Sequence, residues 1–132
     1  MNSFLKTELI DNIIIFTVLK QYPTREEWED SKIITNDWYN YIEKNNIRVG
    51  FIFNLGELSY MRPTYLLEWK DIFEEKREKT QKYIIASSII IQYNIVRQFV
   101  NLFFKAYNPI RPTRLVENIT EGSNFIKSCI SK

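Results

Sequence analysis

The sequence contains no histidine, one cysteine and three glycines, and each shortage excludes a kind of site. Without histidine, the chain lacks the commonest general base and the commonest metal ligand of proteins. Cys129 cannot form an internal disulfide, and a single cysteine with no histidine excludes the usual zinc ligand sets. Gly50, Gly56 and Gly122 are too scattered for a loop that cradles phosphate. We therefore expect no metal site, no cofactor and no familiar catalytic motif.

Long apolar runs are also missing. The longest, such as the stretch from Ile84 to Ile91, are far too short to span a bilayer. Polar and charged residues interrupt the first apolar residues of the chain, which is not the pattern of a signal peptide. The sequence therefore predicts a cytoplasmic protein without a membrane span, in a reducing compartment. Cys129 is then expected to be a small core residue rather than a reactive thiol.

The composition predicts one domain, residues 1–132. A hydrophobic fraction of 45% is sufficient for a core without disulfides, and a charged fraction of 26% is ordinary for a globular protein. The net charge is only +2, and the basic residues are interspersed with acidic ones. A nucleic-acid surface would need lysines and arginines clustered on one face, so we expect no nucleic-acid partner.

The stretch from Ile47 to Leu66 organises the predicted fold. The segment Ile47–Leu55 is short, apolar and rich in β-branched and aromatic residues, which predicts a buried strand. A glycine and polar residues follow, and Pro63 is well suited to the first turn of a helix. A strand, a turn and a helix in this order form half of a parallel βαβ unit. Parallel sheets usually bind their ligands at the loops that follow the carboxyl ends of the strands.

Before this stretch, the sequence predicts a hairpin and a helix. Ser3–Ile10 and Ile13–Leu19 are the two strands, and the Asp-Asn pair between them favours a tight turn. Thr24 and Glu27 have the spacing of a capping box, in which each side chain bonds to the backbone N–H of the other. The helix that they begin is expected to end at Asn46.

After this stretch, helices and strands alternate. The predicted elements are a helix from Pro63 to about Lys79, a strand over Lys82–Gln92, a helix that starts at Asn94, a strand over Arg114–Glu117 and a last helix capped by Thr120. Apolar residues cover more than half of the helix that starts at Asn94, so it is either deeply buried or partly covered by a partner. The order ββαβαβαβα predicts an α/β fold with one mixed sheet and helices packed against it. An exposed first strand at the sheet edge can pair with a second copy, which leaves a homodimer open.

This order and the central stretch resemble the STAS domain, the fold of anti-sigma factor antagonists and related modules. That family carries Asp-Leu-Ser at the end of a strand, a short spacer, and then Asp-Ser-Ser-Gly-Leu at the start of a helix. Here Asn54-Leu55-Gly56, the spacer Leu58-Ser59-Tyr60-Met61 and Arg62-Pro63-Thr64-Tyr65-Leu66 occupy those places without a gap. The resemblance covers nearly the whole chain in architecture, with few identical residues, and it implies a divergent member whose function is regulatory protein–protein interaction.

One departure from the family concerns its phosphorylation switch. In the antagonists, a partner kinase phosphorylates the first serine of the second motif, and that position here is Pro63. Arg62 replaces the acidic residue before it, which reverses the local charge. The resemblance therefore implies a module without the serine switch, unless Thr64 or Ser59 has become the phosphorylated residue. A structural role for Thr64 is to bond the free backbone donors of the first helical turn.

The topology predicts a working end where four loops gather at the carboxyl ends of the strands. Helix N-termini there provide free N–H groups and positive potential, to which Arg62 adds its charge. Tyrosines supply contact area with a hydrogen-bonding tip. The alternative is that Arg62 is a solvated charge and Tyr60 packs under its own loop. The residues expected to contact a partner or ligand are Tyr22, Thr24, Glu57, Ser59, Tyr60, Met61, Arg62, Thr64, Tyr93 and Asn94.

Three functions remain open at this point. The first is a non-catalytic module that binds another protein through this end, with Tyr60 or Arg62 contributing most of the binding energy. The second is a binding domain for a small anionic or lipidic ligand, held between the loop end and the aromatic helix that starts at Asn94. The third is a hydrolase-like enzyme that would use Glu57 and Ser59, although no third residue to orient them is apparent.

Overall fold

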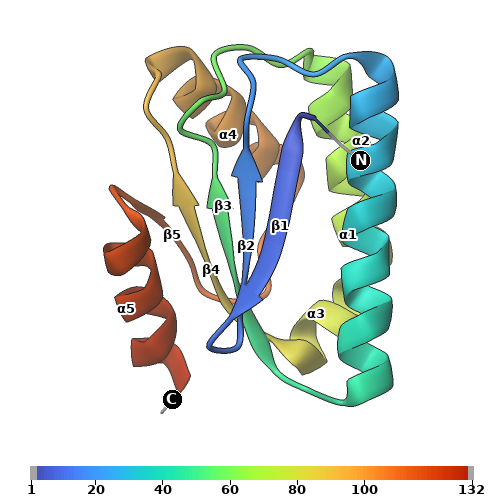
Figure 1. The fold of residues 1–132 in the computed structure, drawn as a ribbon, viewed down its shortest axis with the longest axis vertical. Helices are drawn as coiled ribbons and strands as arrows, with labels where there is room; N and C mark the ends of the chain where they lie inside the picture. Colours follow the sequence, from blue (N-terminus) through green and yellow to red (C-terminus); the bar gives the residue numbers. More distant parts are fainter. Residues whose placement is uncertain (1–2, 131–132) are drawn as a thin grey trace.

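The computed structural model describes residues 3–130 and forms one five-stranded sheet with helices on both faces (Figure 1). The elements are β1 (Leu5–Ile10), β2 (Ile13–Val18), α1 (Arg25–Asn45), β3 (Val49–Asn54), α2 (Pro63–Glu75), α3 (Arg77–Tyr83), β4 (Ile84–Ile90), α4 (Asn94–Ala106), β5 (Thr113–Val116) and α5 (Ile119–Ile130). The predicted α/β class and the single mixed sheet are confirmed.

The sheet has the strand order β1-β2-β3-β4-β5. β1 pairs antiparallel with β2, and every later neighbour pair is parallel. Asp11 and Asn12 have φ angles of 51° and 62°, so both adopt the left-handed conformation that a two-residue hairpin turn requires. This confirms the predicted hairpin, and it places β1 at the sheet edge.

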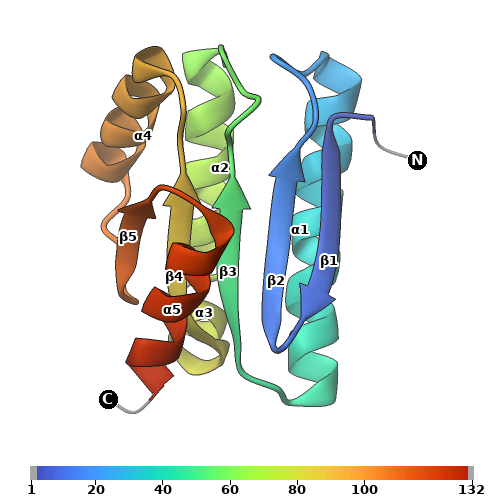
Figure 2. The same cartoon turned by 60° about the vertical axis from the view of Figure 1, so that its left-hand side comes forward.

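The helices are divided unequally between the two faces of the sheet. Figures 1 and 2 show α1 to α4 on one face and α5 alone on the other. β3 is buried on both faces because successive side chains of a strand point in opposite directions. Phe51 belongs to the core under α1, α2 and α4, and its neighbour Ile52 belongs to the smaller core under α5. Cys129 is buried in that smaller core, as expected from the sequence.

Three predicted boundaries are wrong. The strand expected from Lys82 to Gln92 covers only Ile84–Ile90, because Lys82 and Tyr83 belong to α3. The helix expected from Pro63 to about Lys79 ends at Glu75, and Lys76 separates it from α3. The break lets α3 turn its buried Thr80 toward α1, where the Thr80 hydroxyl lies 2.8 Å from the Tyr39 hydroxyl. The last helix is capped by Asn118 and not by Thr120, because the Asn118 side chain accepts from the Glu121 N–H at 2.8 Å.

The apolar face of the aromatic helix α4 is largely covered by the core, which agrees with the first of the two alternatives left open by its sequence. Val96 and Val100 are buried against the sheet, and Phe99, Phe103 and Phe104 are half-buried. Its remaining apolar residues, Ile95 and Leu102, are exposed. Most of the wide apolar face is therefore core, and a smaller part is open to solvent.

Gly50 is required because α5 packs directly on the backbone of β3. A Cβ atom at this position would lie 2.5 Å from Cγ2 of Ile126, well inside van der Waals contact. We expect Gly50→Ala to lower the free energy of unfolding by about 1–3 kcal/mol, the usual effect of an overpacked core. Chemical denaturation measures this difference.

Two further variants control the Gly50 experiment. Gly56→Ala should change stability by less than about 1 kcal/mol, because the added Cβ meets only the Asn54 side-chain oxygen, at 3.2 Å. In the pair Gly50→Ala with Ile126→Ala, the destabilisation should be smaller than the sum of the single effects. Additive single effects would show that the contact with Ile126 is not what excludes a side chain at Gly50.

Candidate functional site

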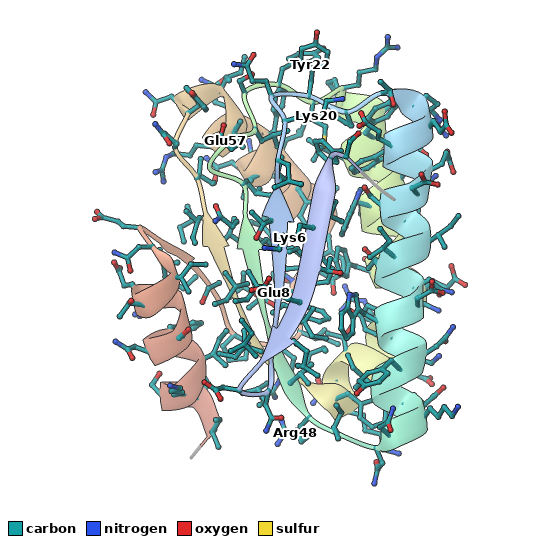
Figure 3. The ribbon with its side chains drawn as sticks, in the orientation of Figure 1. Lys6, Glu8, Lys20, Tyr22, Arg48 and Glu57 are labelled. Atoms are coloured by element: carbon teal, nitrogen blue, oxygen red, sulfur yellow. The ribbon has the colours of Figure 1, made fainter. Side chains whose placement is uncertain are left out.

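The carboxyl ends of the parallel strands gather at one end of the molecule, called here the loop end. The helices α1, α2 and α4 start there, so their N-terminal N–H groups face the same region (Figure 1, top). Figure 3 shows Lys20, Tyr22 and Glu57 at this end, whereas Arg48 lies at the opposite end of the sheet. The sequence predicted this gathering from the topology.

The backbone carbonyl of Gln21 joins the first two loops of the loop end. It accepts from the Ser59 N–H at 2.9 Å and from the Tyr60 N–H at 3.2 Å. The Ser59 hydroxyl also donates to it, at 3.3 Å. These bonds hold the loop after β2 beside the loop after β3, which places Tyr22 near Arg62. No side-chain pattern in the sequence indicates this contact, because its acceptor is a backbone group.

A surface hollow lies between these two loops. Six of the ten predicted residues line it, namely Tyr22, Thr24, Tyr60, Met61, Arg62 and Thr64, together with Pro23, Arg25 and Tyr65. Glu57, Ser59, Tyr93 and Asn94 lie outside its lining. Sequence reasoning missed Arg25 and Tyr65, and the signal that could have found them is their position in the first turns of helices that start at the loop end.

The tyrosines of the loop end are unusually accessible. Tyr22, Tyr60 and Tyr93 are 60%, 46% and 41% exposed. The ring of Tyr60 meets Phe99 of α4 edge-on, with 5.7 Å between ring centroids. Met61 is only 6% exposed and packs into the core. The loop end therefore exposes aromatic area that rests on buried neighbours.

The two arginines of the hollow differ in their partners. Arg25 donates to both carboxylate oxygens of Glu68 on α2, at 2.7 and 2.9 Å, and also pairs with Glu29. Lys32 binds the same Glu68 carboxylate at 2.6 Å. The hydrogen bonds from Arg25 and Lys32 hold the pKa of Glu68 below its ordinary value. Among the described residues, no carboxylate lies within 4.0 Å of Arg62. Arg62 is exposed, and α2 begins after it without a side-chain cap.

Glu27 fixes the start of α1 at the edge of the hollow. Its carboxylate accepts from the Thr24 N–H at 2.9 Å, from Lys20 at 3.0 Å and from the Ser3 hydroxyl. In return, the Thr24 hydroxyl accepts from the Glu27 N–H at 3.1 Å, which confirms the predicted capping box. The bonds from Ser3 and Thr24 lower the pKa of Glu27 to about 2. Thr24 is thus a structural residue of the site.

A second space, a cavity of about 160 Å³, lies between the sheet and helices α1, α2 and α4. Its wall is almost entirely apolar and aromatic, and it includes Trp28 and Trp69. Neither indole N–H has a hydrogen-bond acceptor among the described residues. A buried donor left without an acceptor typically costs about 1–3 kcal/mol. Met61 lines both this cavity and the surface hollow, so its side chain separates the two.

The residues considered for catalysis and metal binding are arranged as follows. Glu57 is exposed, and the Ser59 hydroxyl is bonded to the Gln21 carbonyl. No group of three or more acidic or cysteine side chains in the range 3–130 is placed to hold a metal ion. Within the same range, no helix is long and apolar enough to cross a membrane.

The hairpin, the parallel strands and the unequal division of helices define an α/β protein of the SpoIIAA-like, or STAS, fold. The chain is similar to the crystal structure of an uncharacterized DUF3478-family protein with a SpoIIAA-like fold from Shewanella loihica PV-4. The TM-score is 0.57 at 12% sequence identity, and the match covers 92% of this chain and 91% of that one. No protein-family model and no curated protein matches the sequence. The resemblance drawn from the sequence is therefore confirmed for the fold.

Glu27→Gln tests the attachment of the site to α1. The amide cannot replace a carboxylate that accepts from three donors, so we expect a loss of about 2 kcal/mol in unfolding free energy at neutral pH. Because folding lowers the pKa of Glu27 from 4.5 to about 2, its contribution is complete above pH 4.5 and is lost as the pH falls toward 2. Urea denaturation of both proteins across this range measures the difference.

The exposed neighbour Glu26 supplies the control for this prediction. Glu26→Gln changes the same charge in the same helical turn, without the bonds to Ser3 and Lys20. It should change stability by no more than about 0.5 kcal/mol. A stability difference between Glu27→Gln and wild type that persists unchanged at pH 2 would contradict the role given to the ionised carboxylate.

Proposed function

We propose that this chain is a non-catalytic regulatory module that binds another protein through its loop end. The observation that carries the proposal is the hollow bounded by exposed Tyr22 and Tyr60 and by Arg62, which has no carboxylate neighbour among the described residues. Tyrosine and arginine are enriched in protein interfaces and among the residues that dominate binding energy. The SpoIIAA-like fold supports an interaction module in general terms.

The surface is also held in place before a partner arrives. The Gln21 carbonyl bonds both loops together, the capping box fixes Thr24, and Glu68 holds Arg25. Loops that are already ordered lose little conformational entropy on binding, which favours affinity. We therefore infer that the partner docks on a preformed surface and that Arg62 pairs with an acidic group of the partner. The cytoplasm, predicted from the sequence, is the compartment we propose for this interaction.

We further propose that phosphorylation does not switch this interaction. The serine that the STAS resemblance places at the start of α2 is Pro63 here, which has no hydroxyl. Ser59 already donates its hydroxyl to the Gln21 carbonyl. Thr64 is exposed in the first turn of α2 and is the remaining hydroxyl that a kinase could reach at this position.

The proposal about phosphorylation is tested by intact mass measurement on protein isolated from its native cells. We expect the mass of the unmodified chain in wild type and in Thr64→Ala alike, with no phosphorylated form in either. A phosphorylated form that disappears in Thr64→Ala would show that the switch has moved to Thr64.

The docking surface is tested with the double variant Tyr60→Ala/Arg62→Ala. A photo-crosslinking amino acid at Tyr22 first captures a partner from native lysate, and the purified partner is then titrated against each variant. We expect the double variant to weaken binding by at least about 30-fold, which corresponds to about 2 kcal/mol for two central residues. Isothermal titration calorimetry gives the affinities.

Matched control variants lie at the opposite end of the sheet. Tyr41→Ala/Arg48→Ala removes an exposed tyrosine and an exposed arginine there, and it should leave the affinity unchanged. Equal affinities for wild type and Tyr60→Ala/Arg62→Ala would exclude the loop end as the docking surface. A loss of affinity in the control pair alone would move the surface to the other end of the molecule.

A further inference from the structure

The cavity between the sheet and the helices combines an apolar wall with two unpaired donors. Its volume is about 160 Å³. Its wall includes Trp28 and Trp69, whose ring centroids are 5.4 Å apart. Trp28 is only 2% exposed. Neither indole Nε1–H has an acceptor among the described residues. Two such donors at the wall of one cavity are unusual, because buried polar groups are nearly always bonded.

The other buried polar groups around the cavity are paired. The Tyr39 and Thr80 hydroxyls bond to one another at 2.8 Å, and the Ser31 hydroxyl donates to the Glu27 carbonyl at 2.9 Å. Arg111, at the far wall, donates to the backbone carbonyls of Ile84 and Ile85 at 3.0 and 3.1 Å. Within residues 3–130, the buried side-chain polar atoms that lack a partner are therefore the two indole nitrogens.

We propose that this cavity binds a small, uncharged, largely apolar molecule that carries a carbonyl-type oxygen. The apolar molecule would fill the space, and its oxygen would accept from an indole N–H of the Trp28–Trp69 pair. A charge is disfavoured because burying it without an opposite charge is far more costly than burying a neutral carbonyl. An apolar cavity of about 150 Å³ accommodates benzene, so the ligand has roughly six to ten non-hydrogen atoms.

One entry route passes the residue shared by the two spaces. Met61 lines the cavity on its inner side and the surface hollow on its outer side. Methionine is unbranched and flexible, so its side chain can move aside without a change in the backbone. Met61 therefore marks one route into the cavity, from the loop end. This binding site is separate from the protein-docking surface, and either can exist without the other.

The first test uses two probes of the same shape. Acetophenone carries a carbonyl oxygen, and 2-phenylpropene has a methylene group in its place. The chain has three tryptophans, and Trp38 lies outside the cavity wall, so its indole resonance is an internal control. In nitrogen–proton correlation spectra of ¹⁵N-labelled protein, acetophenone should move the indole proton of Trp28 or Trp69 downfield. Trp38 should stay unmoved, and 2-phenylpropene should bind without the downfield shift.

Single variants then separate the hydrogen bond from the space. Trp69→Phe and Trp28→Phe remove the N–H and keep an aromatic ring, and at least one should weaken acetophenone binding about threefold to tenfold relative to 2-phenylpropene. Trp38→Phe should change neither affinity. Val100→Phe places a ring into the cavity from the wall of α4 and should abolish binding of both probes. Thermal unfolding of each variant checks that it is folded.

Two results would contradict the proposal. Binding of both probes with equal affinity in wild type and in both tryptophan variants would leave an apolar site and overturn the role of the indole donors. No shift of either indole resonance and no rise in Tm with either probe would overturn the ligand site altogether. Because these probes are independent of any protein partner, neither result changes the test of the docking surface.

Discussion

The burial of β3 on both of its faces is the constraint on which the rest of the structure depends. On one face, Ile126 of α5 packs against the backbone at Gly50, where a larger side chain would collide with it. On the opposite face, Phe51 and Phe53 point into the larger core. That arrangement fixes α5 on one side and leaves the other side to α1, α2, α3 and α4 (Figure 2). Because β3 runs parallel to β2 and β4, the loop after it leaves the sheet at the same end as the loops that lead into α1 and α4.

The larger core is unusually aromatic, and the cavity lies within it, beside a closely packed strand. Phe51 meets Phe16 and Tyr39 edge-on, at interplanar angles of 87° and 84°, and Phe53 meets Trp69 at 86°. Edge-to-face pairs are favourable in themselves, and several of these rings line the cavity. The two indole N–H groups lack acceptors because the surrounding wall is built from hydrocarbon. The apolar wall of the cavity thus accounts for the missing acceptors of the two indoles.

Much of this fold could be predicted because its signals are local. The Asp11-Asn12 turn, the Thr24–Glu27 capping box and the apolar runs of β3 and β4 each follow from neighbouring residues. The missed features depend on partners distant in the sequence. The break at Lys76 serves a bond between Thr80 and Tyr39, and the loop end is joined by the carbonyl of Gln21, which no side-chain pattern reveals. The strands predicted where the loop residues would gather, but not which would share a hollow or where a cavity would lie.

Met61 lies between the surface hollow and the cavity. Its side chain lines both spaces and is buried. A molecule in the cavity and a protein in the hollow would each contact this residue, so each would have a preferred conformation for it. If those conformations agree, the first ligand strengthens binding of the second, and if they differ, it weakens it. Thermodynamic linkage makes the effect equal in both directions. A flexible methionine at this place would therefore make the interior of the core a means of regulating the docking surface.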